Sequence, residues 1–123
     1  MRLLLDTHVV LWAVSGHQSL PLRYRNVLKD VDSEVFISAV SEWDIAIKRS
    51  TGKLDVPETF FRILDTTDYV SLDITSGHAR AVERLPKIHK NPFDRLLIAQ
   101  AQCEGMTLAT VDKDILKCDV QVL

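Results

Sequence analysis

Acidic residues follow two apolar runs of the chain at the point where each run ends. The run at residues 3–5 ends on Asp6, and the run at residues 107–111 ends on Asp112. A continuous apolar run is typical of a buried strand in a parallel sheet, and ligands bind at the carboxyl ends of such strands. Taken singly, an acid in this position is also explained as the cap of the next helix. Because parallel strands share one carboxyl edge, we expect Asp6 and Asp112 to lie close together.

Further acids lie early in two predicted helices. Glu42 and Asp44 follow the short strand at residues 35–37, in a helix expected over residues 39–50. Successive helical residues are about 100° apart, so these two side chains lie about 200° apart and at most one points into a shared site. Asp94 begins a helix expected over residues 93–104, where an acid is also favoured by the helix dipole. Topology alone brings Asp94 to the sheet edge only with the help of a loop.

Acids gathered in this way favour metal chemistry. Several carboxylates within about 4 to 6 Å raise one another's pKa and destabilise a fold unless a cation lies among them. Ligation by oxygen alone suits Mg²⁺ or Mn²⁺, and the chain has no Cys and His set with zinc spacing. Magnesium held by carboxylates also binds phosphate oxygens and activates water. The pattern therefore predicts hydrolysis of a phosphodiester.

The elements that must position these acids alternate between strands and helices. We also expect helices at residues 9–14, 20–31, 57–64 and 75–85, a strand at 69–72, a helical turn to residue 117 and a terminal strand at 120–123. This order predicts an α/β fold, a three-layer α/β/α sandwich with a central, mainly parallel sheet. His78, in the helix at residues 75–85, is expected on the surface or half-buried rather than as a ligand.

Composition limits the class of protein. With 123 residues, of which 46% are hydrophobic and 26% charged, the sequence predicts a single globular domain over residues 1–123. A net charge of -2 excludes a broad basic surface but allows a basic rim around an acidic site. Cys103 and Cys118 are expected to be reduced, as in a cytoplasmic protein. No stretch has the length and apolarity of a membrane span.

Four blocks of the sequence resemble PIN-domain ribonucleases of the VapC toxin type. The blocks are LLDTHVVLWA at residues 4–13, SAVSEWDIAIK at 38–48 with GKL at 52–54, NPFDRLLIAQA at 91–101 and LATVD at 108–112. The Asp-Thr-His and Pro-Phe-Asp-Arg blocks in this order are specific. The resemblance implies a PIN-like sandwich, an acidic pocket with one or two Mg²⁺ or Mn²⁺ ions, and metal-dependent cleavage of RNA.

The resemblance also implies roles for single residues. Asp6, Asp94 and Asp112 would bind the metal, and Thr110 would line the pocket. Relatives usually have Glu directly after the tryptophan, and here that position is Asp44. Position therefore favours Asp44 over Glu42 as the fourth acid, and its side chain, one methylene shorter than Glu, would reach the metal only through water. The candidates for contacts with RNA phosphates are Lys48, His89, Lys90 and Arg95.

A toxin of this kind implies a small cognate antitoxin protein that blocks the pocket, and a homodimer. The alternative is a catalytically weak or inactive PIN fold that binds RNA or a protein, which the Asp44 substitution keeps open. A phosphatase with an Asp nucleophile would need a second acid two residues after Asp6, where this chain has His8. A response-regulator receiver would need paired acids near the first strand and a Lys after the last strand, and the sequence lacks both.

Overall fold

The computed structural model describes residues 1–87, 91–112, 115 and 122–123, and within these residues four strands form one parallel sheet. The strands are β1 (Arg2–Leu5), β2 (Glu34–Ser38), β3 (Val70–Leu72) and β4 (Thr107–Ala109). Their order is β3-β2-β1-β4, and every neighbouring pair is parallel. β1 therefore lies inside the sheet, which explains its unbroken apolar sequence.

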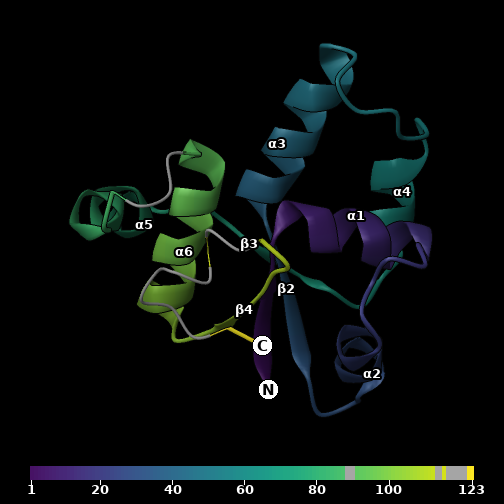
Figure 1. Cartoon of the computed structure of the whole chain (residues 1–123), viewed down its shortest axis with the longest axis horizontal. Helices are drawn as coiled ribbons and strands as arrows, with labels where there is room; N and C mark the ends of the chain where they lie inside the picture. The colour runs from purple at the N-terminus through teal and green to yellow at the C-terminus, as the bar shows by residue number, and fades with distance from the viewer. Residues whose placement is uncertain (88–90, 113–114, 116–121) are drawn as a thin grey trace.

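Helices cover both faces of this sheet (Figure 1). They are α1 (Thr7–Ser15), α2 (Leu22–Lys29), α3 (Ala39–Ser50), α4 (Phe60–Asp65), α5 (Ser76–Ala81), the 3-10 helix η1 (Val82–Arg84) and α6 (Pro92–Glu104). Leu3 and Leu5 pack into a cluster with α1, α2 and α4, whereas Leu4 packs into a second cluster with α6. Alternate side chains of one strand thus serve two cores. The predicted three-layer α/β/α sandwich is confirmed.

Polar caps connect β1 and β2 directly to the next helix at the carboxyl edge. Asp6 accepts a hydrogen bond from the backbone N–H of Val9 at 2.8 Å and begins α1. Ser38 accepts from the N–H of Val40 at 3.0 Å and begins α3. Each side chain satisfies a donor that the first helical turn leaves without a partner. The capping role considered for Asp6 is therefore real, and it fixes this carboxylate at the sheet edge.

The predicted elements have the observed order but differ in extent. The expected helix at residues 75–85 is divided into α5 and η1, and α4 begins at Phe60 rather than at residue 57. β4 ends at Ala109, and the hydroxyl of the next residue, Thr110, donates a hydrogen bond to Asp6. Of the expected terminal strand, Val122 forms an isolated parallel bridge with Leu108, while residues 120–121 lie outside the described residues. Of the expected helical turn to residue 117, Ile115 is described and the residues on either side of it are not. No helix within the described ranges is long and apolar enough to cross a membrane.

Candidate active site

An acidic pocket of about 380 Å³ opens at the carboxyl edge of the sheet. Its wall contains Asp6, Thr7, His8, Asp44, Lys48, Asn91, Asp94, Val111 and Asp112. Four of these residues are the acids expected from the sequence. They come from the end of β1, from α3, from α6 and from the segment after β4, so residues far apart in the chain meet at one place. Convergence at the shared edge of a parallel sheet is the physical reason.

Asp6 is the most deeply placed of the acids that end a strand. The residue is 4% exposed, and its Oδ2 accepts a hydrogen bond from the hydroxyl of Thr110. Burial raises the pKa of Asp6, and the charge of Asp112 adds to the rise, while hydrogen bonds from Thr110 and Val9 and the charge of His8 oppose it. Two carboxylates thus lie close enough to repel. A cation between them would relieve that repulsion.

Thr110 connects these two acids from within the core. It is 1% exposed, and its Oγ1 also accepts a hydrogen bond from the backbone N–H of Asp112 at 3.0 Å. The hydroxyl of Tyr24 donates to its carbonyl oxygen. Thr110 is absent from the pocket wall, although the sequence resemblance implied that it lines the pocket. Its hydrogen bonds to both residues instead fix the position of Asp6 relative to Asp112.

Asp44 faces the acidic pocket from α3. The residue is 2% exposed, and its Oδ1 lies 3.2 Å from Nζ of Lys48, one helical turn later. That contact is close enough for an ion pair, but its angles are not those of a hydrogen bond, so Oδ1 has no hydrogen-bond partner within the described structure. A buried carboxylate oxygen in this state is a natural acceptor for a further cation or its water.

Glu42 points to a different part of the surface. It lines a separate pocket of about 110 Å³ together with Asp65 and Tyr69. Burial raises the pKa of Glu42, and the charge of Asp65 raises it further. The helical spacing therefore separates Glu42 from Asp44 as expected, and it is Asp44 that shares a pocket with Asp6.

Asp94 reaches the edge through the cap of α6. Asn91 accepts hydrogen bonds from the backbone N–H groups of Phe93 and Asp94, at 2.9 and 3.3 Å. Pro92 occupies the first turn, where its missing N–H costs nothing. The cap at Asn91 places Asp94 in the first turn of α6, at the pocket, a position that strand order alone did not specify.

The oxygen atoms of the four aspartates fit a hard divalent cation such as Mg²⁺, which would need further ligands from water or substrate. All four acids offer oxygen, and Asp44 offers an oxygen without a hydrogen bond. No three His, Cys, Asp or Glu side chains in the described part of the chain are grouped tightly enough to hold a metal by themselves. Magnesium usually keeps several waters and binds one or two carboxylates together with substrate phosphates. The acidic pocket has room for this type of coordination, in which water and phosphate oxygens complete the ligands of the ion.

Basic residues near the pocket have different roles. Lys48 is on the wall, beside Asp44. The guanidinium of Arg95 donates to the carbonyls of Pro86 and Val82, at 2.8 and 3.0 Å, and so ties α6 to the segment around η1. Arg95 is not on the pocket wall. His89 and Lys90, the other two candidates for RNA contacts, lie outside the described residues.

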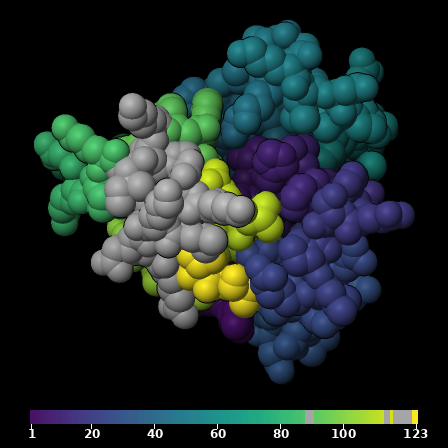
Figure 2. All heavy atoms as spheres, viewed as in Figure 1, coloured from purple at the N-terminus to yellow at the C-terminus, as the bar shows by residue number. Residues whose placement is uncertain are grey.

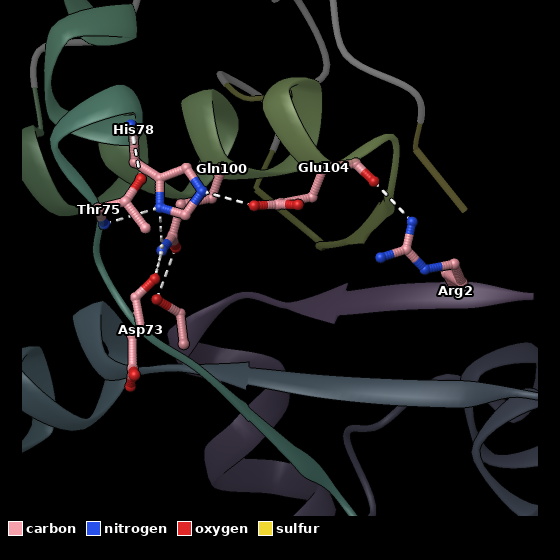
Figure 3. Close-up of polar contacts among 7 residues, drawn as sticks. Arg2, Asp73, Thr75, His78, Gln100 and Glu104 are labelled. Carbon is pink, nitrogen blue, oxygen red and sulfur yellow. Dashed lines mark hydrogen bonds and ion pairs between the residues drawn. The ribbon is translucent and has the colours of Figure 1, made fainter.

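A buried polar network joins the two helices that carry Asp44 and Asp94 (Figure 3). The cap residue Ser38 donates to Oε1 of Gln100 on α6 at 2.6 Å, and Nε2 of Gln100 lies 3.3 Å from Nδ1 of His78. Nδ1 of His78 also accepts from the N–H of Thr75, so its hydrogen is on Nε2, 2.9 Å from Oε1 of Glu104. The network fixes α3 against α6.

The position of His78 corrects the sequence-based expectation. The residue is 2% exposed, neither on the surface nor half-buried. No local pattern around His78 indicates its burial, because its side-chain partners Gln100 and Glu104 come from α6. A Gln at position 100 within an apolar helix was the available signal, since a buried amide requires polar partners.

Comparison with known proteins places the fold. The family model of the PIN domain matches residues 3–120. The structure of VapBC2 from Rickettsia felis, bound to a DNA fragment from their promoter, shares 19% identity, covers 100% of this chain and 97% of that chain, and has a TM-score of 0.75. A toxin-antitoxin complex from Klebsiella pneumoniae shares 19% identity over 98% of this chain and 95% of that chain, with a TM-score of 0.67. The structure of FitAcB from Neisseria gonorrhoeae shares 19% sequence identity, covers 98% of this chain and 96% of that chain, and has a TM-score of 0.67. No curated protein matches the sequence.

Proposed function

The chain belongs to the PIN domain family, and from this premise we propose that it is a Mg²⁺- or Mn²⁺-dependent endoribonuclease, the toxin of a toxin-antitoxin pair. One observation carries the proposal: Asp6, Asp44, Asp94 and Asp112 line a single pocket. Four carboxylates around one space repel one another, and a divalent cation with a bound phosphate is the ligand that resolves this repulsion.

The charged residues of the pocket would hold the ion and the phosphate in this reaction. Asp6, Asp94 and Asp112 would hold the ion, with Asp44 reaching it directly or through water. When bound, the ion supplies positive charge to the phosphate and activates a water. The hydrogen bonds from Thr110 and Val9 favour the ionised form of Asp6, against the effect of its burial. Lys48 adds a positive charge at the wall for a phosphate oxygen.

The partner proposal rests on the relatives. The similar structure from Klebsiella pneumoniae is a toxin-antitoxin complex. A cognate antitoxin that covers the acidic pocket would therefore inhibit this chain, and the toxin would act as a homodimer. An RNA substrate and an exposed free thiol at Cys103 agree with a cytoplasmic location. Residues 1–123 would fold as a single domain.

The proposal is tested by cleavage of single-stranded RNA. The purified protein is expected to cut with Mg²⁺ or Mn²⁺ and to stop in EDTA. Asp6→Asn and Asp94→Asn should each lower the rate about a hundredfold or more, because a lost metal site removes several kcal/mol of transition-state stabilisation. Asp55→Asn, at an exposed position in the loop before α4, is the control for charge. If folded Asp6→Asn and Asp94→Asn, verified by circular dichroism, cut RNA as fast as Asp55→Asn, the nuclease assignment would be refuted.

A second candidate is a PIN fold that binds RNA without cutting it. The observation in its favour is the open arrangement of the acids within the described residues, together with Asp44 in place of a longer Glu. It predicts RNA binding with no metal-dependent cleavage by the wild type. Cleavage that EDTA abolishes would exclude it.

A further inference from the structure

A second cavity, opposite in character to the acidic pocket, lies at the C-terminal end of α1. It has a volume of about 320 Å³. Its wall combines the apolar residues Leu20 and Leu28 with His17, Arg25, Lys29 and Tyr69, and includes no acid. Arg25 and Lys29 come from α2, on the same side of the sheet as α1 (Figure 1). The formal charge of this wall favours an anion without any metal.

The polar groups of this cavity are held in place. Nη2 of the half-buried Arg25 donates to the carbonyl of Gln18 at 2.7 Å, which anchors the guanidinium in the loop between α1 and α2. Nδ1 of His17 accepts from the N–H of Ser19 at 3.0 Å, so the ring hydrogen is on Nε2. Lys29 also borders a neighbouring pocket that contains Asp30 and Asp68. Arg25 and His17 are therefore the principal donors for an anion here.

A row of aromatic rings connects the two cavities along α1. His8, on the wall of the acidic pocket, has its ring centroid 5.4 Å from that of Trp12. Trp12 is stacked on His17, with centroids 6.1 Å apart and planes at 21°. His17 in turn is on the wall of the basic cavity. The row thus begins at one cavity and ends at the other, and Figure 2 shows α1 reaching the surface between the α3–α4 segment and α2.

The basic cavity and the row of aromatic rings together indicate the chemistry of the ligand. Proteins that bind single-stranded nucleic acid combine basic groups for the backbone with aromatic rings on which bases stack. α1 has nine residues, so it spans about 14 Å, a distance that a few nucleotides can cover. A peptide with an acidic side chain would also suit the basic cavity, but it would not explain a row of rings that leads to the acidic pocket.

We propose that the cavity formed by His17, Arg25 and Lys29 binds a backbone phosphate of single-stranded RNA, a few nucleotides from the bond that lies at the acidic pocket. The bases between the two places stack along the His8, Trp12 and His17 row. This inference rests on the proposed ribonuclease function for its substrate. It adds a binding subsite that needs no metal, whereas the acidic pocket repels phosphate until a cation is bound.

Binding in EDTA tests the subsite separately from cleavage. We suggest fluorescence anisotropy with a labelled single-stranded RNA of mixed sequence, in the Asp94→Asn background so that no cutting occurs. Arg25→Gln should weaken binding about tenfold, as expected for loss of a charge-assisted hydrogen bond, and should lower the salt slope by about 0.7 for the lost phosphate. Arg25→Lys should recover part of the affinity. Lys29→Gln, at an exposed position, provides a second variant if Arg25→Gln unfolds.

The control is Arg80→Gln, which removes the same charge from an exposed position on α5, on the other side of the sheet. It should bind RNA like the parent. Unchanged binding by both Arg25→Gln and Lys29→Gln would overturn the subsite even if the wild type cuts RNA. So would loss of antitoxin binding, instead of RNA binding, in these variants. Weakened RNA binding by Arg25→Gln, together with a wild type that never cuts RNA, would support the subsite and refute only the ribonuclease.

Discussion

The hydroxyl of Thr110 donates a hydrogen bond to Oδ2 of Asp6, and so joins the ends of two neighbouring parallel strands, β4 and β1. Oγ1 of Thr110 also accepts a hydrogen bond from the backbone N–H of Asp112. One small side chain thereby sets the separation of two acids of the pocket and stabilises the charge on one of them. This arrangement makes Thr110 a positioning residue, and its effects can be separated from those of the acids.

Thr110→Val should weaken metal binding while leaving the strand pairing intact. The valine has nearly the same shape but no hydroxyl, so the pKa of Asp6 should rise further and protons should compete better with the metal. We expect a Mg²⁺ affinity reduced about tenfold, within the range seen when partners of metal ligands are removed. Isothermal titration at several pH values would measure it, and Thr110→Ser, which keeps the hydroxyl, should behave like the wild type. An unchanged affinity at low pH would contradict this role.

The raised pKa of Asp6 predicts how its charge affects stability. Because the folded-state pKa lies above the unfolded value, the favourable contribution of this group is complete below the unfolded pKa and is lost as pH rises through the folded pKa. In EDTA, the melting temperature of wild type relative to Asp6→Asn should therefore fall as pH rises from about 4. Mg²⁺ at neutral pH should raise the wild-type melting temperature and leave that of Asp6→Asn nearly unchanged. Parallel pH profiles would count against a desolvated carboxylate.

The two acids of α3 should differ sharply in their effect on cleavage. Asp44→Asn is expected to lower the rate about 10- to 100-fold, as for a residue that contacts the metal directly or through water. Glu42→Gln should leave the rate unchanged, because Glu42 lines another pocket. Asp44→Glu, which restores the longer acid of relatives, should keep metal-dependent activity. Rates at saturating Mg²⁺ would decide, and loss of activity only in Glu42→Gln would reverse the assignment.

The buried network should contribute to stability through Gln100. Gln100→Leu leaves the hydroxyl of Ser38 and the ring of His78 without this partner, and each buried polar group left in that state costs about 1 to 3 kcal/mol. Urea denaturation should show the loss, and a double-mutant cycle with Ser38→Ala should give a coupling energy, because the two side chains share a hydrogen bond. Additive effects of the two substitutions would mean that the contact contributes nothing.

Sequence reasoning was strongest where local pattern determines position. The apolar run before Asp6 predicts a buried strand, and parallel pairing then places Asp6 and Asp112 at one edge. The helical repeat likewise separates Glu42 from Asp44. Asp94 required the family resemblance, because strand order alone does not specify where the first turn of α6 lies.

Other features depend on contacts between elements far apart in the chain. The contact of Thr110 with Asp6 and the burial of His78 arise from tertiary packing, which no local pattern encodes. The aromatic row was also hidden, because His17 lies beyond the end of α1 and only the folded turn at Gly16 brings it back to Trp12.

The pairing of β4 with β1 also governs when the acidic pocket is formed during synthesis. Thr110 and Asp6 are 104 residues apart, and β1 can pair with β2 long before β4 has left the ribosome. Chains are made at about 5 to 20 residues per second and begin to fold from the N-terminus. For seconds, therefore, a growing chain has one side of β1 unpaired and no complete set of acids. The four acids can therefore come together only after the chain has been made through Asp112.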